Sequence, residues 1–68
     1  MENTVETNYG TVTVTDVMVD DGRNGLIYGV DINNENGNLL CEVSGCCTDD
    51  LDGDAETIEL LIDTYSEL

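Results

Sequence analysis

Acidic side chains recur at helical spacing near the end of the chain. Four of them are separated by three, four and four residues, so a helix would align them along one stripe: Glu56, Glu59, Asp63 and Glu67. With a rise of about 1.5 Å per residue, neighbouring carboxylates are roughly 4.5 to 6 Å apart along the helix axis. Phosphates along a nucleic-acid strand have spacings of the same order, since the axial rise is ~3.4 Å per nucleotide. The stripe therefore suggests carboxylates that stand in for phosphates.

A second row of acids is expected across a β-sheet. A two-residue turn at Asn36-Gly37 would place Asp31 opposite Glu42, and a four-residue loop over 22–25 would place Asp16 opposite Asp31. Like charges that face each other across strands are destabilising, so a row kept at that cost suggests use. The predicted partner-binding residues are the stripe, the row and two loop acids: Glu56, Glu59, Asp63, Glu67, Asp16, Asp31, Glu42, Asp20 and Asp21.

An alternative chemistry is calcium binding by the segment from Thr48 to Glu59. With Gly53 at the sixth loop position, the acids match most of the EF-hand pattern D-x-[DN]-x-[DN]-G-x₅-E. The first position is Thr48 where Asp is required, and the segment before it is typical of a strand. In this alternative the calcium ligands are Asp50, Asp52, Asp54 and Glu59. The main interpretation includes no metal.

Groups for catalysis are scarce. The chain has no His and no Lys, which removes the usual general base and any Schiff-base chemistry. Cys41, Cys46 and Cys47 lack the spacing of zinc ligands, so we predict reduced thiols, with Cys41 and Cys47 buried and Cys46 exposed. The sequence predicts a protein that is not an enzyme and that uses no cofactor.

The charge balance defines the kind of partner. Sixteen Asp and Glu residues and a single basic residue, Arg23, give 68 residues a formal charge of −15. Direct binding to nucleic acid or to an anionic membrane is excluded, because both require Lys and Arg. A basic protein surface is the expected partner. A salt-adapted interaction domain remains a further alternative, because halophilic surfaces are also rich in acids. No signal peptide or membrane span is visible, which favours the cytoplasm.

The elements follow from residue patterns along what we predict to be a single domain, residues 1–68. Residues 1–9 are polar and expected to be partly disordered. Strands are predicted over about 10–19, 26–33 and 39–45, and an amphipathic helix over about 54–67 with Asp54 as its N-cap. The fold class is therefore α+β: a three-stranded antiparallel β-meander followed by one C-terminal helix packed on one face.

Two features of the strands stay open. A bulge near Thr15-Asp16 would bring all four valines of the first strand to one face; without it, Asp16 points inward. An uncovered Ile27 and Leu40, or an unpaired edge strand, would permit a homodimer. The predicted core contains the apolar residues on the inner faces: Val12, Val14, Val17, Val19, Leu26, Tyr28, Val30, Ile32, Cys41, Val43, Ile58, Leu61, Ile62 and Tyr65.

In character, the whole chain resembles the small phage-encoded inhibitors that imitate nucleic acid, among them anti-CRISPR proteins, anti-restriction proteins and uracil-glycosylase inhibitors. The shared features are short length, extreme acidity, lack of Lys and carboxylate rows on a compact α/β domain. The resemblance implies inhibition of a nucleic-acid-binding protein or complex, such as a CRISPR effector, in the cytoplasm of a host cell.

Overall fold

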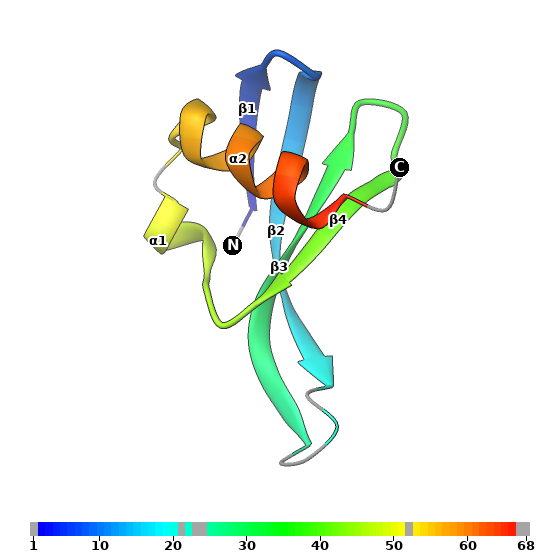
Figure 1. Ribbon diagram of the computed structural model, residues 1–68, viewed down its shortest axis with the longest axis vertical. Coiled ribbons are helices and arrows are strands. Elements are labelled where there is room, and N and C mark those ends of the chain that lie inside the picture. The colour runs from blue at the N-terminus through cyan, green and yellow to red at the C-terminus, as the bar shows by residue number, and fades with distance from the viewer. Residues whose placement is uncertain (1, 21, 23–24, 52, 67–68) are drawn as a thin grey trace.

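A computed structural model describes residues 2–20, 22, 25–51 and 53–66. This part of the chain is α+β, as predicted, with one antiparallel sheet in the order β1-β2-β3-β4 and helices on one face (Figure 1). It measures 35 × 25 × 19 Å along its principal axes. The elements are β1 (Glu2–Thr7), β2 (Gly10–Asp20), β3 (Leu26–Asn34), β4 (Leu39–Ser44), α1 (Thr48–Leu51) and α2 (Ala55–Tyr65).

The sheet has four strands, not the three predicted, because β1 forms in the segment expected to be partly disordered. β1 pairs with β2 along its whole length, with Val5 opposite Val12. Only Val5 in this strand is apolar enough to pack against the core, which is why its composition resembles a frayed terminus. Thr7 Oγ1 closes the β1–β2 turn by donating to the carbonyl of Gly10 and accepting from the amide of Tyr9.

The β2–β3 hairpin has a register one residue away from the predicted one. Thr15, not Asp16, lies opposite Asp31, and Asp16 lies opposite Val30. Pairing is continuous and free of a bulge, so Asp16 shares the face of Val14, as the second of the two open possibilities required. The strands pair up to Asp20 and Leu26, which leaves a five-residue connection over 21–25 in place of a four-residue loop.

The β3–β4 hairpin keeps the predicted register over its central residues. Val30 lies opposite Val43, Asp31 opposite Glu42, and Ile32 opposite Cys41. Past Ile32 the register shifts so that Asn33 faces Leu39, which makes Leu40 the extra residue of a bulge. The turn is accordingly longer than the predicted pair of residues: the amide of Asn34 donates to the carbonyl of Asn38, and the Asn34 side chain accepts from the amides of Asn36 and Asn38.

The core lies between the upper sheet and the helices, where α1 contacts β2 and α2 contacts β1 and β4 (Figure 1). Leu51, in a segment expected to be an acidic loop, belongs to it. Leu26, Tyr28 and Tyr65 were wrongly predicted to be core residues, as each is more than half exposed. Val17, Val19 and Leu61 are only partly buried. The buried apolar residues are Val12, Val14, Val30, Ile32, Cys41, Val43, Leu51, Ile58 and Ile62.

Beyond the body, β2 and β3 continue as a two-stranded ribbon (Figure 1). Pairing with β1 stops at Thr15, and pairing with β4 stops at Gly29. We call the ribbon formed by residues 16–20 and 26–28 the hairpin arm. The base of the arm contacts a helix at Asp16, and the rest of the ribbon extends away from α1 and α2 (Figure 1). This explains why apolar residues of the ribbon are exposed although their alternation predicted burial.

Helix α2 begins where the sequence predicts and ends somewhat earlier than predicted. Asp54 is its N-cap, with a carboxylate that accepts from the amide of Glu56. The helix ends at Tyr65, and the amide of Ser66 donates to the carbonyl of Ile62. Ile58 and Ile62 bury one face against the sheet, as helical spacing predicts.

Candidate acidic interface

The helices of the described residues, α1 and α2, both lie on one face of the sheet and leave the other face open (Figure 1). Side chains alternate between the faces of a strand, so the partners of the buried valines point away from the helices. This open face is polar and rich in threonine. Its residues on the four paired strands are Glu2, Thr4, Glu6, Thr11, Thr13, Thr15, Asp31, Asn33 and Glu42.

Three acids of the open face lie in one line across the sheet. Glu2 pairs with Thr15, Thr15 with Asp31, and Asp31 with Glu42. We call Glu2, Asp31 and Glu42 the acid row. Neighbouring strands are about 4.8 Å apart, so Asp31 and Glu42 have a spacing of the same order as that of phosphates. Glu2 lies two strands, about 10 Å, from Asp31, because Thr15 stands between them. The predicted row had Asp16 in place of Glu2. The alternation of β1 was the signal that sequence reasoning missed.

Asp31 and Glu42 repel each other within this row. A hydrogen bond between the two carboxyl groups, together with the charge of Asp31, raises the pKa of Glu42. The Oδ1 atom of Asp31 is buried and lacks a hydrogen-bond partner in the described part of the chain. When both groups are ionised, the two carboxylates repel each other, and a cationic group of a binding partner would relieve this repulsion.

Asp16 lies on the helix side of the sheet and forms hydrogen bonds to α1. Its carboxylate accepts from the amide of Thr48 at 2.8 Å and from the hydroxyl of Thr48 at 3.1 Å. The hydrogen bond from the backbone amide of Thr48 lowers the pKa of Asp16, because it favours the ionised carboxylate. Thr48 is the first residue of α1 and is only 1% exposed. A strand acid thus fixes the start of α1, and Asp16 does not belong to the acid row.

The predicted helical stripe is partly occupied by internal contacts. Glu59 accepts from the backbone amide of Asn8 at 2.7 Å and from its side-chain amide at 3.2 Å. The hydroxyl of Tyr9 donates to Asp63, which raises the pKa of Tyr9. These bonds attach the β1–β2 turn to α2. Glu56 is exposed and Glu67 lies outside the described residues.

The two acids predicted in the β2–β3 loop lie at the tip of the hairpin arm or beyond the described residues. Asp20 is exposed, and its carboxylate accepts from the amide of Gly22 at 2.8 Å. This bond forms a local turn of the kind that Asp favours. Asp21 lies outside the described residues. Asp20 is therefore five residues beyond Thr15 along β2, at the end of the arm that is farthest from the acid row.

The candidate calcium ligands with a described placement make separate hydrogen bonds in different parts of the structure. Asp50 accepts from the amide of Cys47 at 3.1 Å, and Asp54 accepts from the hydroxyl of Thr57 at 2.8 Å, which lowers the pKa of Asp54. Glu59 is bonded to the β1–β2 turn, and Asp52 lies outside the described residues. Among the residues with a described placement, no three His, Cys, Asp or Glu side chains come together in a way that could hold a metal ion.

The cysteines are free thiols with different surroundings. Burial raises the pKa of Cys41 to about 11 and also raises the pKa of Cys46. Cys46 packs against the core, while Cys47 is partly exposed beside the hairpin arm. The prediction had Cys47 buried and Cys46 exposed, whereas both are half-buried and Cys46 is the one that packs against the core. It assumed strand alternation, but β4 ends at Ser44, and Gly45, with φ of 85°, turns the chain.

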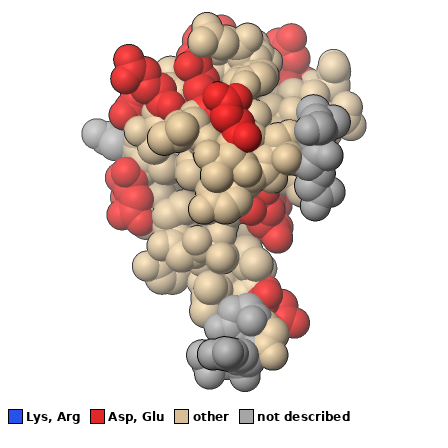
Figure 2. Space-filling model, viewed as in Figure 1, with Lys and Arg blue, Asp and Glu red and all other residues tan. Residues whose placement is uncertain are grey.

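The acidic side chains of the described residues lie at the surface. Every described Asp and Glu is exposed or partly exposed, and the single basic residue of the chain, Arg23, lies outside the described residues. Figure 2 shows carboxylates over the helices and upper body, and again at the tip of the arm. Most of the arm between them is free of acids in this view.

Comparisons with known proteins leave the acidic surface as the main guide to function. No protein-family model matches the chain, and neither curated proteins nor solved structures yield a significant match. In residues 2–20, 22, 25–51 and 53–66, no helix has both the length and the apolar character needed to cross a membrane.

Proposed function

We propose that this chain binds a basic nucleic-acid-binding protein or complex and inhibits it by presenting carboxylates in place of phosphates. The target class includes CRISPR effectors and similar machinery, as the resemblance to phage inhibitors implies. The observation that carries the proposal is the acid row on the sheet face opposite α1 and α2. The partner's Lys and Arg side chains would lie across Glu2, Asp31 and Glu42.

The repulsion between Asp31 and Glu42 supports this use. A guanidinium group that bridges two carboxylates forms charge-assisted hydrogen bonds with both of them. The two ionised carboxylates destabilise each other in the free protein. A cation would therefore bind more favourably beside this pair than beside an isolated acid. Binding would also lower the raised pKa of Glu42. The complex should therefore release a proton and strengthen as the pH rises through that pKa.

The threonines between the acids suit the same partner. Thr4, Thr13 and Thr15 offer hydroxyl groups along the open face. A hydroxyl can accept from a Lys or Arg side chain and adds no charge. The open face is therefore a polar surface on which basic side chains can find acceptors between the carboxylates.

Competition with nucleic acid tests the proposal. The immobilised protein captures proteins from a bacterial lysate, and excess duplex DNA or RNA is then added. We expect nucleic acid to release the captured target, because both ligands would occupy one groove, and we expect binding to weaken steeply as salt rises. Captured proteins that stay bound at any excess of DNA and RNA would show that the mimicry proposal is wrong.

Matched pairs of substitutions separate the acid row from net charge. Glu2→Gln with Glu42→Gln removes two carboxylates of the row, while Glu35→Gln with Asp49→Asn removes two exposed acids elsewhere. We expect the first pair to weaken binding to the purified target by about tenfold and the second pair by much less. Equal losses would attribute binding to net charge alone and remove the row from the proposal.

A further inference from the structure

The hairpin arm is apolar on both faces. On the face that points to the helix side, Met18, Leu26 and Tyr28 are 59%, 63% and 55% exposed. On the other face, Val17, Val19 and Ile27 are partly exposed. Small soluble domains seldom leave so many large apolar side chains together at the surface, and Met and Tyr are enriched where proteins meet.

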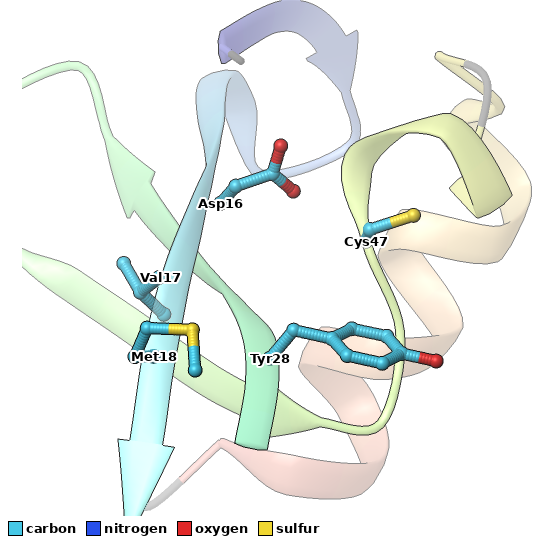
Figure 3. A pocket seen from close by; sticks show the side chains of 5 residues that line it. All are labelled: Asp16, Val17, Met18, Tyr28 and Cys47. Atoms are coloured by element: carbon cyan, nitrogen blue, oxygen red, sulfur yellow. The ribbon is translucent and has the colours of Figure 1, made fainter. Parts of the chain in front are cut away.

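A groove lies at the base of the arm, between β2, β3 and the segment that leads into α1 (Figure 3). Met18 and Tyr28 face each other across the two strands. The ring of Tyr28 extends toward the segment that carries Cys47, and Asp16 bounds the other end of the groove. The groove is thus an apolar depression with a carboxylate at its edge, open enough to receive a side chain from outside.

The charges around this apolar surface are negative. Asp16 lies at the groove, Asp20 lies near the tip of the arm, and the described residues include no Lys or Arg. A second copy of the chain would also carry a net charge of −15. Charges closer than the Debye length of about 8 Å at physiological salt are poorly screened, so pairing of two copies through the arm is disfavoured. A basic partner is favoured for the same reason.

The arm continues the open face that carries the acid row. The next line of residues beyond Thr15 and Asp31 contains Val17 and Gly29, and the following line contains Val19 and Ile27. A partner that lies across the row would therefore meet Val17, Val19 and Ile27 without any rearrangement of the sheet. The groove, with Met18 and Tyr28, lies on the opposite face of the arm and is a separate contact surface.

We infer that the hairpin arm and its groove dock an apolar side chain that lies between Lys or Arg residues on the surface of a protein partner. The apolar contact would be insensitive to salt, in contrast to the attraction of the acid row. This inference rests on the proposed function for the positive charge of the partner. It adds an apolar contact on the helix-side face of the arm, opposite the face of the acid row.

Two short basic peptides test the inference. One carries a pair of leucines between lysines, and the other has serines in place of the leucines. Fluorescence anisotropy measures the affinity of each for the full chain at low and at high salt. We expect the leucine peptide to bind about tenfold more tightly, and this ratio should persist at high salt, because burial of a leucine side chain is a hydrophobic gain.

Substitutions on the arm have a closely matched control. Leu26 on the arm and Leu60 on α2 are both 63% exposed. Leu26→Ser, and separately Tyr28→Ser, should abolish the preference for leucine and leave the affinity for the serine peptide unchanged. Leu60→Ser should retain the full preference. Thermal melting, monitored by circular dichroism, confirms that each variant is folded. Met18→Ser replaces any arm variant that does not fold.

The outcomes separate this inference from the proposed function. If neither peptide binds, the basic partner of the proposed function is wrong. If both bind equally, or if Leu60→Ser removes the preference as well as Leu26→Ser does, the arm is not the docking surface. A dimer in sedimentation equilibrium that dissociates in Tyr28→Ser would show that a second copy covers the arm, which also overturns the inference.

Discussion

The pairing of Asp31 with Glu42 has an energetic consequence that can be measured on the free protein. Hydrogen bonding to Asp31 raises the pKa of Glu42, so the folded state holds this proton more tightly than the unfolded chain does. The stabilisation that protonated Glu42 contributes is complete below its unfolded pKa and is lost as pH rises through the raised folded pKa. At neutral pH the ionised pair therefore destabilises the fold.

Glu42→Gln should consequently raise the melting temperature at pH 7. The gain should shrink as the pH falls through the pKa of Glu42, because the native carboxyl group then also becomes neutral. Thermal melts from pH 3 to pH 8 measure this, with Glu35→Gln in the exposed β3–β4 turn as the control for net charge. A Glu42→Gln variant that melts lower than the native protein at pH 7 would contradict the prediction.

Residue types alone did not reveal which acids are engaged internally. Glu59 and Asp63 have the same helical spacing as Glu56, yet only those two are bonded to Asn8 and Tyr9. The partners lie more than fifty residues away along the chain, so no local pattern encodes the contact. The N-cap Asp54, by contrast, was predicted correctly because its bonds are to the next residues of the same helix.

At the scale of elements, Gly29 is the position where the arm joins the body. A Cβ atom there would lie 2.6 Å from the carbonyl oxygen of Val43 and 2.8 Å from Cγ2 of Val19. The missing side chain lets Val19 fold over β3 and lets β4 approach closely. The close approach is to backbone, which cannot move aside as a flexible side chain would.

Gly29→Ala should therefore destabilise the protein by about 1 to 3 kcal/mol, the usual cost of overpacking. Urea unfolding measures the loss, and Ser44→Ala, an exposed neighbour on β4, should change the free energy of unfolding by less than about 0.5 kcal/mol. Equal stability of Gly29→Ala and the native protein would show that Val19 and β4 adjust without cost.

The strands show how far sequence reasoning reaches at this scale. Matching of apolar faces correctly paired Val30 with Val43, because an error of one residue there would expose the core side of β4. The β2–β3 register was predicted from an assumed four-residue loop, and apolar residues on both faces of the arm gave no pattern to correct it. The bulge at Leu40 depends on how Leu40 packs against the core, which no turn signal describes.

For the whole molecule, self-repulsion of the 15 net negative charges opposes folding. Raising sodium chloride from about 10 mM to about 500 mM shortens the Debye length from ~30 Å to a few ångströms. We expect the melting temperature to rise by several degrees and then level off, with the chain already folded at low salt. A chain that is unfolded at low salt and folds only near molar salt would instead be a salt-adapted domain, and the purpose of its acidity would be solubility in brine.

The bonds from Asn8 to Glu59 and from Tyr9 to Asp63 limit how the protein can be redesigned. Someone who wishes to make a less charged derivative, for example to reduce non-specific adsorption, would choose acids to neutralise. Glutamine at Glu59 or asparagine at Asp63 would loosen the attachment of the first hairpin to the last helix. Glu35 and Asp49, which accept no hydrogen bonds within the described chain, are the safer positions for such changes.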